Sequence, residues 1–109
     1  MKTNPDWPTV RFLNQDCMLN FDRYRNGRLA LSLIFRDEDG FMEVMTTASV
    51  NLPHAPLNEG EMFIKDWSEN EGLLQALIDA GVVRRPLRWV TSGYVEVPAV
   101  RLLIMPEVD

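Results

Sequence analysis

The sequence contains one histidine and one cysteine, two side chain types that often carry acid–base or nucleophilic chemistry near neutral pH. His54 lies between two prolines, and no nucleophile or orienting carboxylate stands at a motif spacing from it. Cys17 falls on the apolar face of a predicted strand beside Leu19 and Phe21, where a thiol packs as a small hydrophobic side chain. We therefore expect His54 to be an exposed loop residue and Cys17 a core residue.

Carboxylates are numerous, but their spacing matches no catalytic or metal-binding motif. Asp37-Glu38-Asp39-Gly40 resembles part of a calcium loop, yet it lacks the alternate ligand positions and the terminal bidentate glutamate of an EF-hand. A hairpin turn explains these residues better. Two carboxylates can hydrolyse a glycoside only at a suitable distance from each other, and nothing in the sequence selects one such pair. The motifs of phosphate-binding loops, dinucleotide sites, serine hydrolases and zinc proteases are also absent. The sequence therefore predicts a non-enzymatic protein without cofactor or metal.

The middle of the chain is strongly acidic. The 109 residues have a formal net charge of -5, and residues 37–79 contain ten acidic side chains but only one lysine. A concentrated negative surface repels nucleic acid and attracts basic protein surfaces. The plainer alternative is that these carboxylates are solvated and serve solubility. The candidate residues for an acidic, partner-binding face are Asp37, Glu38, Asp39, Glu43, Asp66, Glu69 and Glu71.

Nine of the eleven basic residues are arginines, and they suggest two alternative surfaces. One is a basic patch on or beside a predicted hairpin, formed by Arg23, Arg25, Arg28 and Arg36. With Tyr24 among them, these residues could contact nucleic acid, although the net charge disfavours it. The other is the segment 84–89, Arg-Arg-Pro-Leu-Arg-Trp, which could anchor a protein partner. We favour the interpretation that Trp89 is a core residue and that these arginines are solvated or paired within the fold.

Alternation of apolar and polar residues predicts an antiparallel meander in the first half of the chain. The expected strands cover residues 10–12, 17–24, 29–35 and 41–50. Asn26-Gly27 predicts a type I′ turn, because that turn requires positive φ at both central residues. Residues 37–40 form the next predicted turn.

The second half predicts short strands at 62–64, 87–91 and 94–104, with Pro98 favouring an edge position or a bulge. Ser68 and Glu71 match a capping box, a leucine-rich stripe follows, and Gly81 is the expected residue just after the helix. The predicted fold class is α+β. We expect an antiparallel β-sheet of about five to seven strands that starts as a meander, with one main helix at about 69–80 packed on it.

Length and composition predict one domain, residues 1–109, with an ordered core over about 8–105 and the first seven residues outside it. One cysteine excludes an intrachain disulfide. The sequence has no apolar run of about 18 residues and no apolar N-terminal signal, so we expect a cytoplasmic protein without membrane contact.

The stretch Ile64–Gly72, preceded by Asn51-Leu52-Pro53 and followed by Ala80-Gly81-Val82, resembles a motif of small uncharacterised proteins of bacterial phages, plasmids and conjugative elements. The hairpin at 24–28 and Gly93-Tyr94-Val95 fit the same pattern, so the resemblance covers about residues 17–103, although only 64–72 is specific. Trp67 stands where that motif has tyrosine. The resemblance implies an origin on a mobile element and brings no catalytic residues.

Three functions of different classes follow as hypotheses. The first is a mobile-element or phage accessory protein that binds another protein, in particular an acidic inhibitor that occupies the basic nucleic-acid channel of a host defence nuclease, of the anti-CRISPR or anti-restriction type. The second is a nucleic-acid-associated accessory protein that uses the arginine hairpin. The third is an enzyme or small-ligand binder with a pocket between helix and sheet. A homodimer is compatible with all three, because edge strands are expected and twofold association is the commonest oligomer.

Overall fold

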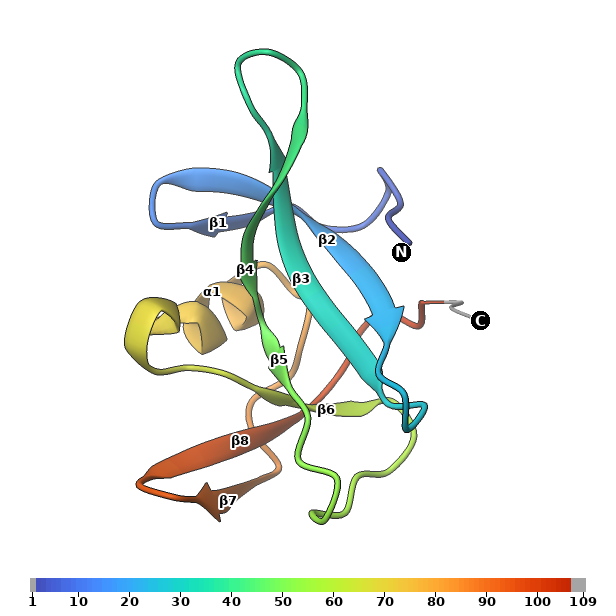
Figure 1. The fold of residues 1–109 in the computed structure, drawn as a ribbon, viewed down its shortest axis with the longest axis vertical. Coiled ribbons are helices and arrows are strands. Elements are labelled where there is room, and N and C mark those ends of the chain that lie inside the picture. The colour runs from blue at the N-terminus through green and yellow to red at the C-terminus, as the bar shows by residue number, and fades with distance from the viewer. Residues whose placement is uncertain (1, 107–109) are drawn as a thin grey trace.

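The computed structural model describes residues 2–106, and the predicted α+β class with a meander start is confirmed (Figure 1). The first four strands are β1 (Val10–Phe12), β2 (Gln15–Arg23), β3 (Leu29–Arg36) and β4 (Met42–Thr47). The other four strands are β5 (Ser49–Val50), β6 (Glu61–Ile64), β7 (Arg88–Ser92) and β8 (Val95–Arg101). Between β6 and β7 lie a 3₁₀ turn, η1 (Ser68–Asn70), and one helix, α1 (Leu73–Asp79). The predicted domain also includes residue 1 and residues 107–109, which lie outside the described residues.

The eight described strands form two antiparallel sheets instead of one sheet of five to seven strands. The first sheet has the order β1-β2-β3-β4, and the second has the order β5-β6-β8-β7. The strand predicted at 41–50 divides at Ala48, since β4 pairs with β3 and β5 pairs with β6. The buried Ala48 donates its N–H to the carbonyl of Leu31 and accepts from the N–H of Lys65, both at 2.8 Å. This one residue therefore connects the two sheets.

A larger core joins both sheets and the helix, and a smaller one lies on the far face of the second sheet. Cys17 is fully buried in the larger core, which confirms the prediction for this thiol. Other members of the larger core are Leu19, Phe21, Leu31, Leu33, Met62, Ile64, Leu73, Leu77 and Val100. Phe63, Val97 and Ala99 form the smaller core beneath the loop that contains Leu52, Ala55 and Leu57. The second sheet is therefore covered on both faces.

The type I′ turn predicted at Asn26-Gly27 is wrong. Only Gly27 has positive φ, at 87°, and the bond from the Tyr24 N–H to the Arg28 carbonyl closes a three-residue loop in which the glycine takes the left-handed position. The type I′ pattern occurs between β1 and β2 instead, where Leu13 and Asn14 have φ of 50° and 63°.

The helix begins four residues later than predicted, and its end is as predicted. No side chain forms the expected capping box, and Ser68 itself adopts φ of 58° in the 3₁₀ turn. At the other end Gly81 donates to Ile78 and Val82 donates to Leu77, each at 3.0 Å, and Val82 is fully buried. These two bonds are the Schellman arrangement that the glycine predicts.

Two further expectations concern Pro98, which lies in β8, and the first seven residues, which contact β2. Pro98 lies one residue beyond the last β6 pair, Phe63 with Ala99, so β8 is locally an edge there and the prediction is confirmed. The first seven residues do not all lie outside the ordered core. Lys2 exchanges two backbone hydrogen bonds of 2.7 Å with Phe21, and the ring of Trp7 packs edge-on against that of Phe21.

Candidate protein-binding surfaces

The hairpin that joins β3 to β4 projects beyond the rest of the fold (Figure 1). Its loop is closed by backbone bonds between Asp37 and Phe41 and between Gly40 and Asp37. The Asp37 carboxylate also accepts the N–H groups of Asp39 and Phe41, each at 2.9 Å. Gly40 has φ of 87°, which allows the chain to turn back without strain. Asp37 therefore shapes the loop, and the predicted hairpin turn at 37–40 is confirmed.

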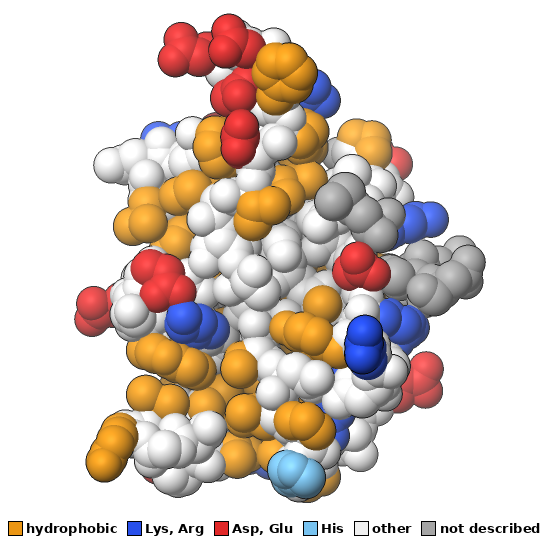
Figure 2. Space-filling model, viewed as in Figure 1, with side chains coloured by type: hydrophobic (Ala, Val, Ile, Leu, Met, Phe, Trp, Pro, Cys, Tyr) orange, Lys and Arg blue, Asp and Glu red, His pale blue; other side chains and the backbone are white. Residues whose placement is uncertain are grey.

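The other acidic residues of this hairpin face solvent. Glu38, Asp39 and Glu43 are exposed, and their carboxylates have no hydrogen-bond or ion-pair partner within residues 2–106. Figure 2 shows this acidic group at the projecting end of the molecule. The nearest basic residue along the chain, Arg36, donates to the carbonyl of Gly40 at 2.7 Å. The hairpin tip therefore carries a net negative charge.

Apolar side chains accompany these carboxylates. Phe41 is 69% exposed and Val44 is 61% exposed, and Met42 is also exposed. Val44 lies beside Ile34, and Ile34 beside Met18, so Val44 extends an apolar row on the outer face of the first sheet. Among the described strands β4 pairs only with β3 and is an edge strand. Sequence reasoning missed these apolar residues, although Phe41-Met42 directly after an acidic turn is a usable signal.

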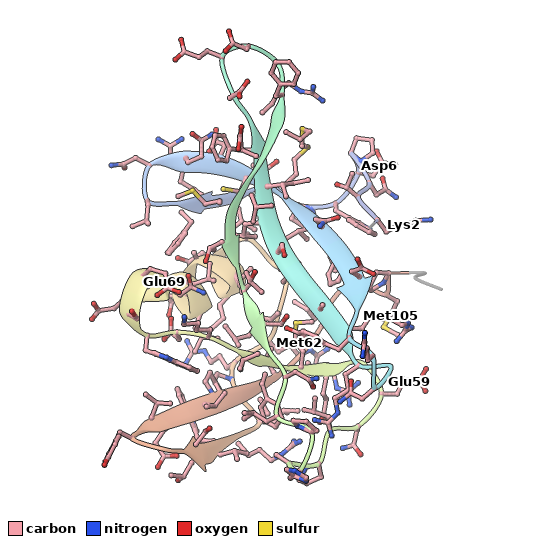
Figure 3. The ribbon with its side chains drawn as sticks, in the orientation of Figure 1. Lys2, Asp6, Glu59, Met62, Glu69 and Met105 are labelled. Atoms are coloured by element: carbon pink, nitrogen blue, oxygen red, sulfur yellow. The ribbon has the colours of Figure 1, made fainter. Side chains whose placement is uncertain are left out.

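The remaining acidic candidates lie on the connection between β6 and α1, and two of them have local partners, so the seven residues do not form one face. Asp66 accepts the N–H of Leu74 at 2.8 Å at the start of α1. Hydrogen bonds from Lys65, from the backbone N–H of Glu69 itself and from the Ser68 side chain lower the pKa of Glu69 to about 2. Glu71 is exposed on the same connection. Figure 3 shows Glu69 beside the helix, well away from the hairpin tip.

The structure brings together only part of the predicted basic patch: Arg23 and Arg28 line one cavity, and Arg25 lies on the loop between them. Arg28 donates to the carbonyls of Leu52 and Ala55 at 2.7 and 2.6 Å, so its guanidinium fastens a loop. Arg23 donates to the carbonyl of Gly27 at 2.7 Å, and Arg25 is exposed. Arg36 lies at the opposite end of β3 from Arg28, and the Tyr24 hydroxyl is hydrogen-bonded to Ser49. The predicted four-arginine patch is therefore incomplete, because Arg36 lies apart from the other three arginines.

Trp89 is not a core residue, contrary to the prediction. It is 53% exposed on β7, and Leu87 is 51% exposed just before that strand. Arg84 and Arg85 are exposed and have no side-chain partner within residues 2–106. Among the described strands β7 pairs only with β8, so it is the second open edge with exposed apolar residues. The expectation that these arginines are solvated or paired within the fold holds, since Arg84 and Arg85 are exposed and Arg88 pairs with Glu61.

Arg88 belongs to an ionic group around the buried Glu61 carboxylate, which sequence reasoning missed. Its guanidinium lies 3.0 Å from the Glu61 carboxylate, whose side chain is only 3% exposed, and Arg101 approaches the same carboxylate at 3.6 Å. The backbone N–H and the side-chain amide of Asn58 also donate to Glu61, at 3.0 and 3.2 Å. The Asn58 N–H is the main cause of a lowered pKa at Glu61; burial opposes it, and Arg88 reinforces it. No spacing in the sequence distinguishes Glu61 from its acidic neighbours.

Two surface cavities lie at the end of the molecule where the loop 51–60 runs. One, of about 410 Å³, has a mixed lining that includes Arg23, Asn58, Glu59 and Met105, two of which are labelled in Figure 3. The other, of about 460 Å³, lies between residues 52–56 and β7. His54 is exposed on that loop, as predicted. Neither of these two cavities is lined by residues of α1.

Within residues 2–106, no group of three or more histidine, cysteine, aspartate or glutamate side chains is placed to hold a metal ion. No helix in that range is both long enough and apolar enough to cross a membrane. In comparisons with known proteins, no family model, no curated protein and no solved structure matches the chain.

Proposed function

We propose that this is a non-enzymatic accessory protein that binds another protein through the β3–β4 hairpin. The partner presents a positively charged cleft, into which the acidic tip and Phe41 insert. In its specific form, the proposal is that the hairpin occupies the nucleic-acid channel of a defence nuclease and so inhibits it. The resemblance to proteins of mobile elements motivates this choice of partner.

One observation carries the proposal: free carboxylates and exposed apolar side chains occur together on a projecting, well-closed loop. Glu38, Asp39 and Glu43 supply charge, which steers encounter with a basic surface and disfavours wrong partners. Phe41 supplies an apolar anchor of the kind that dominates binding energy. Because the Asp37 carboxylate already holds the loop, little ordering entropy is lost on binding.

The test compares two variants with the same change in net charge. The hairpin variant is Glu38→Lys, Asp39→Lys and Glu43→Lys, and it leaves Asp37 intact because that residue closes the loop. The control variant is Asp6→Lys, Glu59→Lys and Glu71→Lys, three exposed carboxylates away from the hairpin. Each tagged protein is used to capture partners from bacterial lysate, with and without nuclease treatment, and the bound proteins are identified by mass spectrometry.

We expect one stoichiometric protein partner to survive nuclease treatment with the wild type and the control variant. The hairpin variant should bind the purified partner at least about tenfold more weakly, a loss of about 1.4 kcal/mol. Excess DNA or RNA should release the partner from the wild type, because both ligands use one channel. Equal binding by the hairpin variant would exclude this surface. Capture only through nucleic acid would favour the second hypothesis.

A further inference from the structure

Two of the four strands that end the described sheets, β4 and β7, carry exposed apolar side chains and lie next to opposite charges. The β4 edge follows the acidic loop, and the β7 edge follows Arg84 and Arg85. Unpaired N–H and C=O groups along an edge strand can pair with a strand of another chain. Each of these two edges also carries exposed apolar side chains. The two edges are therefore complementary: both offer unpaired backbone groups and exposed apolar side chains, and their charges are opposite.

The basic edge is held in place by the fold. Arg84 donates its backbone N–H to Arg101 at 3.0 Å, and Leu87 donates to Ala99 at 2.8 Å, so the segment before β7 is fixed against β8. Glu61 already pairs with Arg88, which leaves Arg84 and Arg85 as the exposed positive charges. The one carboxylate on the neighbouring strand, Glu96, accepts a hydrogen bond from Thr91 near the far end of β7.

The acidic edge is open over only part of its length. The Asn70 side chain donates to the carbonyl of Thr47 at 2.9 Å and accepts from the Thr46 hydroxyl, so it covers the end of β4. The open part is Met42–Met45, which lies next to the acidic tip. Exposed Val44 and Met42 flank Glu43 there, so charge and apolar surface alternate along the strand.

We propose that the chain associates with copies of itself, the β4 edge of one copy pairing with the β7 edge of a second. Carboxylates precede β4 and arginines precede β7, so a parallel alignment brings the opposite charges together. Val44 and Met42 then lie against Trp89 and Leu87. This contact is heterologous: the pair keeps one free β4 edge and one free β7 edge, so addition continues into a ring or a filament. The contact differs from the closed twofold dimer that the sequence allows, and it makes the hairpin unavailable to another partner.

Charge reversal on each side, separately and together, tests this contact. The hairpin variant defined above reverses the acidic side, and Arg84→Glu with Arg85→Glu reverses the basic side. All five side chains are exposed, and circular dichroism verifies that each variant is folded. Mass is measured by light scattering at concentrations up to about 1 mM, where even weak association is populated. The monomer mass is 12.6 kDa.

We expect the wild type and the Asp6, Glu59 and Glu71 control variant to exceed the monomer mass as concentration rises, and high salt to reduce that mass. Either reversal alone should give a monomer. The five-residue variant that combines both reversals should associate again, because the charges are exchanged and not removed. It should still fail to bind the partner of the proposed function, so the two proposals can fail separately. A wild type that remains monomeric, or association that persists in either single reversal, would overturn this contact.

Discussion

The carboxylate of Asp66 accepts a hydrogen bond from the backbone N–H of Leu74, eight residues further along the chain, at 2.8 Å. Leu74 is the second residue of α1, and Gly72, in the position before the helix, provides no side chain to cap it. Asp66 therefore satisfies an N–H group that the first turn of a helix leaves free. The residue that sequence analysis assigned to a partner-binding face stabilises the helix.

Asp66→Ala should lower the free energy of unfolding by about 1 kcal/mol, the usual cost of losing a helix cap. Ser68→Ala should cost less than about 0.5 kcal/mol, because Ser68 makes no side-chain cap bond. Both values come from urea unfolding monitored by circular dichroism. A larger loss for Ser68 than for Asp66 would mean that the capping box predicted from the sequence is the real one.

Arg28→Ala should loosen the loop 51–57. The substitution removes charged hydrogen bonds to the carbonyls of Leu52 and Ala55, and we expect a loss of about 2 kcal/mol in the free energy of unfolding. Hydrogen exchange should become faster in that loop and stay unchanged in β3. Arg25→Ala, on the same hairpin but without a described side-chain partner, is the matched control and should change stability by less than about 0.5 kcal/mol. Equal effects of the two substitutions would show that Arg28 does not fasten the loop.

Local patterns predicted those parts of the fold that depend on local chemistry. The β2–β3 hairpin and the end of α1 follow from alternation and from glycines that adopt positive φ near the expected positions. The division of residues 41–50 does not follow from local pattern. It depends on Ala48, which bonds to Leu31 and to Lys65, each 17 residues away in the chain. Such long-range pairing leaves no signal in the alternation of side chains.

Sequence patterns predicted the local parts of the candidate surfaces and missed the parts that depend on how the chain folds. The loop 37–40 was recognisable as an exposed acidic turn, because Asp-Gly turns are local. Asp66 and Glu69 have local partners and lie away from that loop. Their positions depend on the path of the chain between β6 and α1. Trp89 is exposed because β7 is the last strand of its sheet. Strand order cannot be read from chain order here, so the apolar pattern alone assigned Trp89 to the core.

The Glu69 carboxyl group should titrate far below an ordinary glutamate. Hydrogen bonds from Lys65, from the backbone N–H of Glu69 and from Ser68 lower its pKa to about 2, and NMR of the side-chain carbonyl can follow that titration. Lys65→Gln should raise the pKa of Glu69 towards its ordinary value of 4.5, because it removes the larger cause. The pair is at the surface, so added salt should raise this pKa in the wild type as well. A wild-type midpoint near 4.5 would show that the contact does not persist in solution.

Glu61 should make stability depend on pH. Its pKa is lowered in the folded protein, chiefly by the Asn58 N–H and further by Arg88. A lowered folded-state pKa means that the unfolded chain binds the proton more readily. The stabilisation is therefore fully present above the ordinary value of 4.5, and it is lost as pH falls through the folded-state pKa below that value.

Glu61→Gln should lower the free energy of unfolding at pH 7 by about 2 kcal/mol, because the Arg88 side chain loses a charged partner in a buried site. The difference from the wild type should shrink as pH falls below 4.5, where the wild-type carboxylate becomes protonated as well. Arg101→Gln is the control for the ionic group. It lies 3.6 Å from the carboxylate and is nearly half exposed, so its loss should cost less than about 1 kcal/mol. If the wild type and Glu61→Gln differ equally at pH 3 and pH 7, the stabilisation does not come from the ionised carboxylate.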